Sequence, residues 1–431
     1  MKRVPWGRFA SVPGSLFRSA PFVGVRRGDG LTAIRGSLLS ATPQNSLLKL
    51  IAACAFGLEA LVKRELTALG YPAHVDQPGR VCFTGDWTAV CRANLWLRTA
   101  DRVLIEVMKY PAADFDALFD TVKEFDWSEF LPADAQFPVN GKSRLSTITS
   151  VPAIQRSVKK AIVESLLRTH GTTSLPESGA VYPIDIALLN DVSTITLDTT
   201  GISLHKRGYR TLNAEAPIKE TLAAALVDLS VWHPDRLLID PFCGSGTIPI
   251  EAAMIGMNIA PGLNREFACG DWSLVPSSTW SDTKQEARDL IRHDRELQII
   301  GSDRDAKVLD LARFHADKAG VKKQIRFEHR DFHELESAVE YGCIVTNPPY
   351  GERLEDEDAV LDLYMSIPSV MRHLPTWSLF LITSFPQFER VIQREADRRR
   401  KLYNGRIECT YYQYLGPRPP KGHFPERPRT P

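Results

Sequence analysis

The chain has 431 residues, more than one typical domain holds, so its length predicts two or three globular units. Hydrophobic residues make up 43% and charged residues 24%, as in a protein with real cores rather than a disordered or fibrous chain. The formal net charge is only +1, so any surface for a polyanion has to be a local concentration of positive charge.

The cysteines and the apolar runs argue against a zinc protein, a disulfide-rich protein and a membrane-spanning protein. The seven cysteines are scattered and form no C-x-x-C pair, so the chain predicts neither a zinc site nor a disulfide scaffold, and we expect no metal. This spacing suits a reducing, cytoplasmic compartment. No run of about 18 apolar residues occurs, so we expect no membrane-spanning helix and no membrane partner.

Both ends differ from the rest in composition. Residues 1–45 carry seven basic side chains against one acid, which predicts a poorly ordered basic extension. Two alternatives stay open: an organelle transit peptide, which this Arg- and Ser-rich composition also suits, or a wrongly assigned start codon. Residues 416–431 hold six prolines and four basic residues, which predicts a solvated, Pro-rich basic tail.

Residues 46–200 predict an α+β region. Apolar runs indicate strands at 48–53, 81–83, 102–108, 184–188 and 194–197. Helical periodicity indicates helices over 58–69, 90–97 and 151–167. The last helix carries Arg156, Lys159 and Lys160 on its outer face, and an Asn190-Asp191 turn joins the last two strands.

In residues 201–415 strands and helices alternate. A basic connector that includes Lys206 and Arg207 leads into strands at 237–239, 298–301, 325–328, 343–346 and 377–384. Helices are expected over 248–255 and 306–319. This alternation predicts a doubly wound α/β sheet, whose ligands bind at the carboxyl ends of the strands. Residues 259–296 are expected to form a loop-rich insertion on the substrate side.

The first of four candidate motifs follows the strand at 237–239 and precedes a helix. It consists of Asp240, Pro241, Phe242, Cys243, Gly244, Ser245, Gly246 and Thr247. Glycines let the backbone approach a ligand, and free N–H groups at a helix start attract a carboxylate. The spacing matches neither a phosphate loop nor G-x-G-x-x-G, which favours a site where the acid binds an ammonium group. A plain tight turn is the alternative.

Two acidic strand ends form the second and third motifs. Asp303, followed by Arg304, lies where dinucleotide-like folds place a carboxylate for ribose hydroxyls, although it can also cap a helix. Asp331 closes the strand at 325–328 and is a candidate acceptor for an adenine amino group, or a simple strand-end cap.

The fourth motif is Asn347-Pro348-Pro349-Tyr350, directly after an apolar strand. The two prolines fix the turn and direct carbonyls into the crevice at the strand end. The Asn347 amide oxygen and the Pro348 carbonyl can accept both hydrogens of an aromatic amino group, which aims the nitrogen lone pair at a methyl donor. Tyr350 offers a face on which an extruded base can stack.

In this order the four motifs resemble those of class I S-adenosylmethionine-dependent methyltransferases that act on amino groups. The stretches 203–210, 215–223, 251–255 and 259–262 narrow the resemblance to the bacterial 23S rRNA guanine-N2 methyltransferase family. The resemblance implies a Rossmann-like catalytic domain over 201–415, preceded by a ferredoxin-like plus THUMP RNA-binding region over 46–200. It implies S-adenosylmethionine as cofactor and S-adenosylhomocysteine as its product.

The resemblance also assigns roles to residues. Asn347, Pro348, Pro349 and Tyr350 become the catalytic tetrapeptide, with Asn347 also at the cofactor, and Thr221 joins the cofactor site. An RNA-facing surface is expected at Arg156, Lys159, Lys160, Lys206 and Arg207. The expected partner is structured RNA, above all large-subunit rRNA, and a single catalytic domain implies a single methylation.

Three alternatives stay open. The RNA can be tRNA, or the substrate can be DNA, because adenine-N6 and cytosine-N4 methylation use the same tetrapeptide. The chain can also be an RNA-binding assembly factor with an inactive cofactor pocket. Carbon-5 methylation of pyrimidines needs a cysteine beside the base, and none stands in the positions directly after Asn347, so we interpret Cys243 as a small loop residue.

Overall fold

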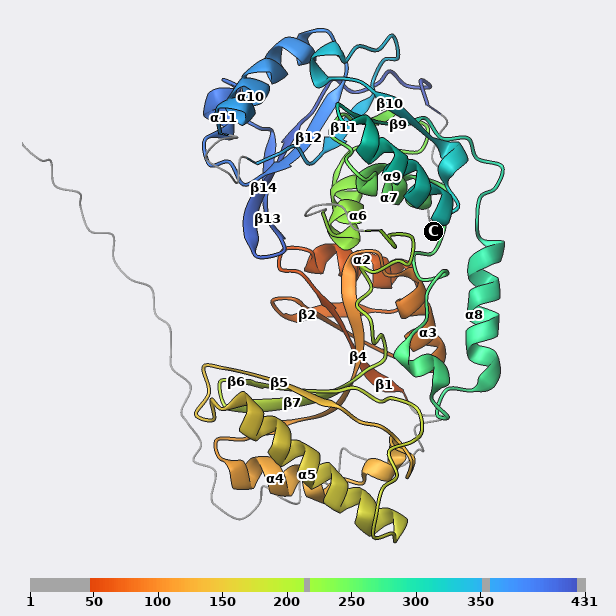
Figure 1. The fold of residues 1–431 in the computed structure, drawn as a ribbon, viewed down its shortest axis with the longest axis vertical. Helices are drawn as coiled ribbons and strands as arrows, with labels where there is room; N and C mark the ends of the chain where they lie inside the picture. The colour runs from red at the N-terminus through yellow and green to blue at the C-terminus, as the bar shows by residue number, and fades with distance from the viewer. Residues whose placement is uncertain (1–46, 213–217, 351–356, 425–431) are drawn as a thin grey trace, which may run out of the picture. The chain divides into compact units, whose positions relative to one another are not determined.

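The computed structural model describes residues 47–212, 218–350 and 357–424. The predicted basic extension, the end of the tail and residues 215–217 of one family stretch lie outside these ranges. Within them, fourteen strands form two seven-stranded sheets (Figure 1).

The first sheet has the strand order β2-β3-β1-β4-β7-β6-β5. Its strands are β1 (Leu48–Cys54), β2 (Ala73–Gln77), β3 (Arg80–Gly85), β4 (Ala100–Pro111), β5 (Val139–Arg144), β6 (Ile184–Leu189) and β7 (Val192–Asp198). Neighbours are antiparallel except β5 and β6. The long strand β4 pairs with both β1 and β7, so the predicted α+β region is built on one continuous sheet. The sequence did not predict β2 and β5.

The helices of this region begin and end at recognisable signals. They are α2 (Glu59–Ala68), α3 (Trp87–Trp96), α4 (Phe115–Glu124), the 3₁₀ turn η1 (Trp127–Glu129) and α5 (Val151–His170). Asp86 caps α3 by accepting from the Ala89 amide, and α5 ends at Gly171 in the left-handed conformation. Asn190 and Asp191 both have positive φ, as the predicted β6–β7 turn requires.

The second sheet has the order β10-β9-β8-β11-β12-β14-β13. Its strands are β8 (Leu238–Asp240), β9 (Ile299–Asp303), β10 (Ile325–His329), β11 (Cys343–Thr346), β12 (Ser378–Thr383), β13 (Arg398–Asn404) and β14 (Ile407–Tyr414). The strands from β10 to β12 are parallel, which confirms the predicted Rossmann-like fold. The β13–β14 hairpin is antiparallel and was not predicted.

Helices cover both faces of this sheet, as Figure 1 shows. They are α6 (Glu220–Leu229), α7 (Thr247–Gly256), α9 (Ala306–Lys318), α10 (Glu357–Arg372) and α11 (Phe388–Val391), with 3₁₀ turns η3 (Lys322–Gln324) and η4 (Phe332–Glu334). Successive side chains of β11 point to opposite faces of the sheet, so they belong to two different hydrophobic cores. Val345 lies in the core with α6, α7 and α9, here called the second core, and Ile344 in the core with α10 and α11.

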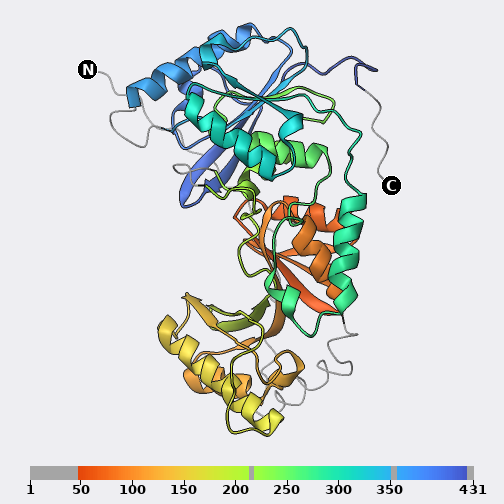
Figure 2. The ribbon, with the colours of Figure 1, turned by 45° about the vertical axis from the view of Figure 1, so that its right-hand side comes forward.

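The insertion at 259–296 packs against the first region, and its place on the substrate side stays a prediction. It contains η2 (Ala268–Asp271) and α8 (Ser277–Asp289), and α8 lies beside α3 in Figures 1 and 2. Trp272 is buried in the core of the first sheet, stacked on Tyr182 at 4.6 Å. An ion pair of 3.1 Å between Arg92 and Glu286 fixes α8 on α3. Apolar side chains on the insertion therefore direct it to the first region.

We expect Trp272→Ala to lower the free energy of unfolding by about 3–5 kcal/mol, because it removes a buried ring and the hydrogen bond from its indole nitrogen to the Val181 carbonyl. Urea denaturation measures the change. Leu290→Ala, at a side chain that is 47% exposed, is the matched control and should change stability by less than about 0.5 kcal/mol. Equal midpoints for the two variants would contradict the packing described above.

Candidate active site

The loop between β8 and α7 begins at Asp240, a residue that is 1% exposed. One oxygen, Oδ1, accepts a hydrogen bond from the Thr346 hydroxyl at 2.6 Å and another from the Phe242 amide at 3.2 Å. Asp240 ends β8 and Thr346 ends β11, the neighbouring parallel strand. The bond therefore joins the first candidate motif to the strand that carries the fourth.

Two glycines shape this loop, with φ of 50° at Gly244 and 85° at Gly246. A Cβ atom on Gly244 would meet no atom within 4 Å, so the backbone there borders open space. A Cβ atom on Gly246 would lie 3.0 Å from that of Ala312 on α9 and 3.2 Å from the Phe327 ring on β10. Glycine at 246 therefore lets a helix and a strand pack directly against the loop.

Asp303 connects the second motif to the first. Its Oδ2 accepts from the Gly244 amide at 2.9 Å, and its Oδ1 accepts from the Asp305 amide at 3.0 Å. The N-cap of α9 is Asp305, which accepts from the Lys307 amide, so Asp303 is not the helix cap. Asp303 instead holds the glycine loop at the end of β9.

The Asn347–Tyr350 turn is held from both sides. The Tyr350 hydroxyl donates to the Asn347 amide oxygen, and the hydroxyl of Tyr364 on α10 donates to the Pro349 carbonyl at 2.8 Å. No residue in the described ranges donates to the Pro348 carbonyl. An amide oxygen has two lone pairs, so Asn347 and Pro348 each keep acceptor capacity. The Tyr350 ring, predicted to stack on a base, is half-buried against the second core.

A cavity of about 520 Å³ borders the first and fourth motifs, within the size range of small-molecule sites. The predicted residues that line it are Asp240, Phe242, Cys243, Gly244, Ser245, Thr247 and Asn347. Because Thr247 and Ile248 belong to its wall, the cavity lies at the start of α7, where backbone N–H groups have no intrahelical partner.

Burial changes the protonation of two groups in this wall. Loss of solvation raises the pKa of Asp240 to about 7, against the hydrogen bonds from Thr346 and Phe242, which lower it. No cationic side chain in the described ranges pairs with this carboxylate. Burial also raises the pKa of the Cys243 thiol well above its usual value, so Cys243 is protonated and unsuited to nucleophilic attack.

Comparison with known proteins places these features in a family. Residues 207–413 match the profile of the RMKL-like methyltransferase domain, 49–104 that of the RlmL ferredoxin-like domain, and 112–198 that of the THUMP domain. The Bacillus subtilis (strain 168) protein YpsC, provisionally named an RNA methyltransferase, is 47% identical over 367 residues, which cover 85% of this chain and 95% of YpsC. The chain belongs to the THUMP-containing RMKL-like RNA methyltransferases.

Two solved structures share this architecture. A Listeria monocytogenes protein, described as a predicted N6-adenine-specific DNA methylase, is 49% identical with a TM-score of 0.84, covering 87% of this chain and 98% of its own. The protein SMU.472, provisionally named a methyltransferase and crystallised with S-adenosylhomocysteine, is 42% identical with a TM-score of 0.83, covering 87% of this chain and 100% of its own. The chain is thus a class I S-adenosylmethionine-dependent methyltransferase.

Several predicted cofactor residues of this methyltransferase lie outside the cavity wall. The Thr221 hydroxyl donates to Asp101 at 3.3 Å, and Arg304 is exposed. Asp331 accepts from the His333 amide at 2.9 Å and caps η4, which is the alternative role that the sequence left open. Its neighbour Phe332 is buried and its ring lies 5.0 Å from that of Phe242, so the third motif supports the loop between β8 and α7 through packing.

Arg207 was predicted to face RNA, and this prediction was wrong. Its side chain is 1% exposed, donates to the Leu204 and Arg98 carbonyls, and lies 3.5 Å from Glu251. A buried cation needs such partners and cannot reach a phosphate. Lys206 is exposed, as an RNA contact requires.

The predicted RNA-facing residues on α5 differ in their ionic partners. Lys159 lies 3.0 Å from Glu177 and Lys160 lies 3.7 Å from Glu164. Arg156 is exposed and has no ion-pair partner among the residues that the structure describes. The positive charge of this helix is therefore partly compensated.

The sequence did not predict six residues of the cavity wall, which are Ile218, Ile248, Asp305, Lys307, Val308 and Leu311. Four of them belong to the start of α9 or its cap. The sequence contained a signal for these residues, because α9 begins shortly after Asp303 and helical spacing puts Val308 and Leu311 on one face.

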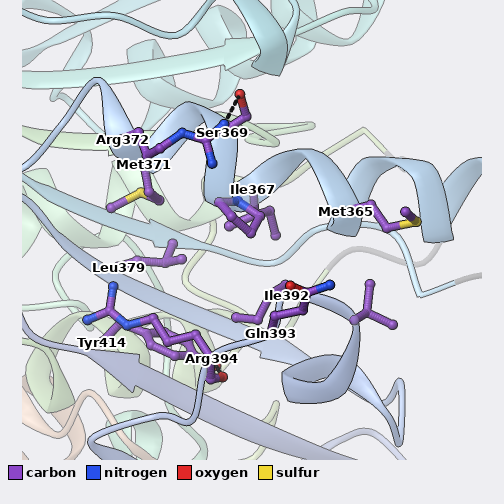
Figure 3. A pocket seen from close by; sticks show the side chains of 12 residues that line it. Met365, Ile367, Ser369, Met371, Arg372, Leu379, Ile392, Gln393, Arg394 and Tyr414 are labelled. Atoms are coloured by element: carbon purple, nitrogen blue, oxygen red, sulfur yellow. Dashed lines mark hydrogen bonds between the residues drawn. The ribbon is translucent and has the colours of Figure 1, made fainter.

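A second cavity of about 580 Å³ lies apart from this site and contains none of the predicted residues. Figure 3 shows its lining, in which Met371 and Arg372 come from α10 and Leu379 and Tyr414 from β12 and β14. Leu379 is near the start of β12, whereas the active-site loops lie at the opposite, carboxyl ends of the parallel strands. The larger cavity is therefore not the cofactor site.

Among the residues that the structure describes, no helix is both long and apolar enough to cross a membrane. No three histidine, cysteine or acidic side chains there cluster as metal ligands.

Glycines 244 and 246 provide a matched test of the loop. Gly244→Ala should cost about 1–2 kcal/mol of stability, since only the left-handed backbone opposes it. Gly246→Ala should cost more, because its methyl group also collides with Ala312 and Phe327. Thermal unfolding of both variants without ligand measures the order. The reverse order, or equal losses, would show that α9 does not pack against the loop as described.

Proposed function

We propose that this methyltransferase transfers a methyl group from S-adenosylmethionine to the N2 amino group of a guanine in 23S rRNA. The observation that supports it best is the pair of acceptors, the Asn347 amide oxygen and the Pro348 carbonyl, beside a cavity that Asn347 itself lines. tRNA guanine N2 is the first alternative. DNA adenine N6, which the description of the Listeria protein names, is the second.

The cavity fits S-adenosylmethionine by the chemistry of its wall. Asp240 is a buried carboxylate without a cationic partner in the described ranges, which suits the ammonium group of the methionine moiety. The start of α7 suits its carboxylate, and Ile218, Val308 and Leu311 offer apolar contacts. When bound, this cofactor supplies an electrophilic methyl group on a sulfonium.

The residues of the turn would prepare the acceptor amine. An aromatic amino group is a weak nucleophile because its lone pair is delocalised into the ring. If Asn347 and Pro348 each accept one hydrogen, the nitrogen becomes more pyramidal and its lone pair points along the line of transfer. The acceptors also favour the positive charge that develops on nitrogen, and no reorganisation is needed because Tyr350 and Tyr364 already fix the turn.

The choice of RNA rests on the region before the catalytic domain. Residues 112–198 match the THUMP profile, and YpsC carries an RNA methyltransferase name. Large-subunit rRNA is favoured within RNA because residues 49–104 match the RlmL ferredoxin-like domain. The match to the THUMP profile and the name of YpsC also favour RNA over DNA as the substrate.

Purified wild-type chain with S-adenosylmethionine should form N2-methylguanosine in an unmodified 23S rRNA transcript, detected by mass mapping of nucleosides. Total tRNA and duplex DNA run in parallel, and modification of either one instead would replace the proposal. Asn347→Ala should lower kcat by about 10²–10³-fold, because an oriented acceptor is lost, while S-adenosylhomocysteine still binds. Asn264→Ala, at an exposed asparagine, is the control. Unchanged turnover in Asn347→Ala would refute its role.

Cofactor affinity should depend on pH through Asp240. With its pKa raised to about 7, the carboxyl group of the free protein is mostly protonated below that pH, and the ammonium group of the ligand favours the ionised form. Binding therefore releases a proton, and affinity for S-adenosylhomocysteine should fall up to about tenfold per pH unit below about pH 7 and level off above it.

Calorimetry in two buffers of different ionisation enthalpy measures the released proton. Asp240→Asn should bind more weakly at pH 8 and lose the dependence, whereas Asn264→Ala should keep it. A flat profile for the wild-type chain would show that Asp240 does not contact the ammonium group.

A further inference from the structure

The outer strand of the second sheet, β13, carries an unusual concentration of positive charge. Between Glu389 and Glu408 the chain has seven basic and four acidic residues, although its total net charge is +1. Four consecutive exposed positions are basic, from Arg398 to Lys401. β13 is the last strand of its sheet and pairs only with β14 in the described ranges, so one side of its backbone is also unpaired.

The two faces of β13 differ in charge compensation. On one face, Arg399 lies 2.8 Å from Glu389 and Lys401 lies 2.6 Å from Glu408. On the other face lie Arg398 and Arg400, since side chains alternate along a strand. Neither has an ion-pair partner among the described residues, and nor does Arg406 in the exposed β13–β14 turn. We call Arg398, Arg400 and Arg406 the β13 edge.

Three of the four acids in this segment have partners of their own, and the charge of the fourth, Glu395, acts on Arg399, on the face of β13 that already has ion pairs. Glu389 and Glu408 form the ion pairs with Arg399 and Lys401. Asp397 accepts from the Leu415 amide at 2.7 Å. Charged residues on an outer strand also prevent its pairing with another chain. Three arginines without acidic partners exceed what that purpose requires, and arginine is the side chain best matched to phosphate.

The hairpin leads from this edge to the catalytic turn. The Tyr350 hydroxyl interacts with the side chains of Asn404, at the end of β13, and Cys409 on β14. Thr410 on β14 pairs with Thr383, and the Thr383 hydroxyl lies 2.8 Å from that of Tyr364, which holds Pro349. The seven residues of β13 span roughly 20 Å, enough for several phosphates.

We propose that the β13 edge binds the phosphate backbone of the RNA substrate next to the nucleotide that enters the active site. The inference rests on the proposed RNA function and adds to it a second RNA surface, on the catalytic domain. Guanidinium groups along the edge contact phosphates without reading sequence, so they position the RNA rather than select the base. The THUMP region and the β13 edge then bind different parts of one RNA.

The test compares Arg398→Ala/Arg400→Ala with the wild-type chain in filter binding to an unmodified 23S rRNA transcript over a salt series. The double variant should bind about tenfold more weakly at low salt, and the slope of log affinity against log salt should fall by about 1.4–2, for two lost phosphate contacts. KM for RNA should rise while S-adenosylhomocysteine affinity and the unfolding midpoint stay unchanged. Arg398→Lys/Arg400→Lys should restore most of the slope.

The matched control is Arg288→Ala/Arg292→Ala, which removes two exposed arginines near the end of α8. It should behave like the wild-type chain. If the β13 variant also titrates like the wild-type chain, the inference is overturned and the proposed function stands. If the wild-type chain itself does not bind RNA, both fall together.

Discussion

The site depends on one buried hydrogen bond, from the Thr346 hydroxyl to the Asp240 carboxylate at 2.6 Å. Both residues are 1% exposed, and each ends one of two adjacent parallel strands, β8 and β11. Loss of this donor would leave Oδ1 of the buried carboxyl group with only the longer hydrogen bond from the Phe242 amide, at a cost of about 1–3 kcal/mol. The loop that lines the cofactor cavity and the turn that follows β11 are therefore held at a fixed separation, as in-line transfer between two bound molecules requires.

The other motifs hold the loops at the ends of neighbouring strands, two through hydrogen bonds and one through packing. Asp303 at the end of β9 fixes the glycine loop through the Gly244 amide, and Tyr364 fixes the catalytic turn from the opposite face of the sheet. The third motif takes part only through packing of Phe332 on Phe242. The resulting wall is rigid on the cofactor side. Its other side keeps free lone pairs at Asn347 and Pro348, where the proposed substrate amine would bind.

The sequence predicted the parts of this site that follow from strand ends. Apolar runs ending in Asp240 and Asn347 located neighbouring parallel strands, and the structure brings both residues to one cavity. The β13 strand was missed because its residues are charged rather than alternating, as suits an outer strand with little to bury. Arg207 was predicted to be exposed because its neighbours in the sequence are basic. Packing against residues distant in the sequence instead buries it beside Glu251. The local pattern of residues in the sequence does not show such tertiary contacts.

Whether a basic surface can attract RNA depends on whether its charges are already paired with acids, rather than on its number of basic residues. Counterion release requires a cation whose charge is not already neutralised within the protein. Lys159 and Lys160 on α5 have acidic neighbours, and an RNA phosphate there has to compete with Glu177 and Glu164. Arg398 and Arg400 have no ion-pair partner in the described ranges. Although the net charge of the chain is only +1, the uncompensated arginines of β13 produce a local positive field, which under the proposed function would attract the backbone of the RNA.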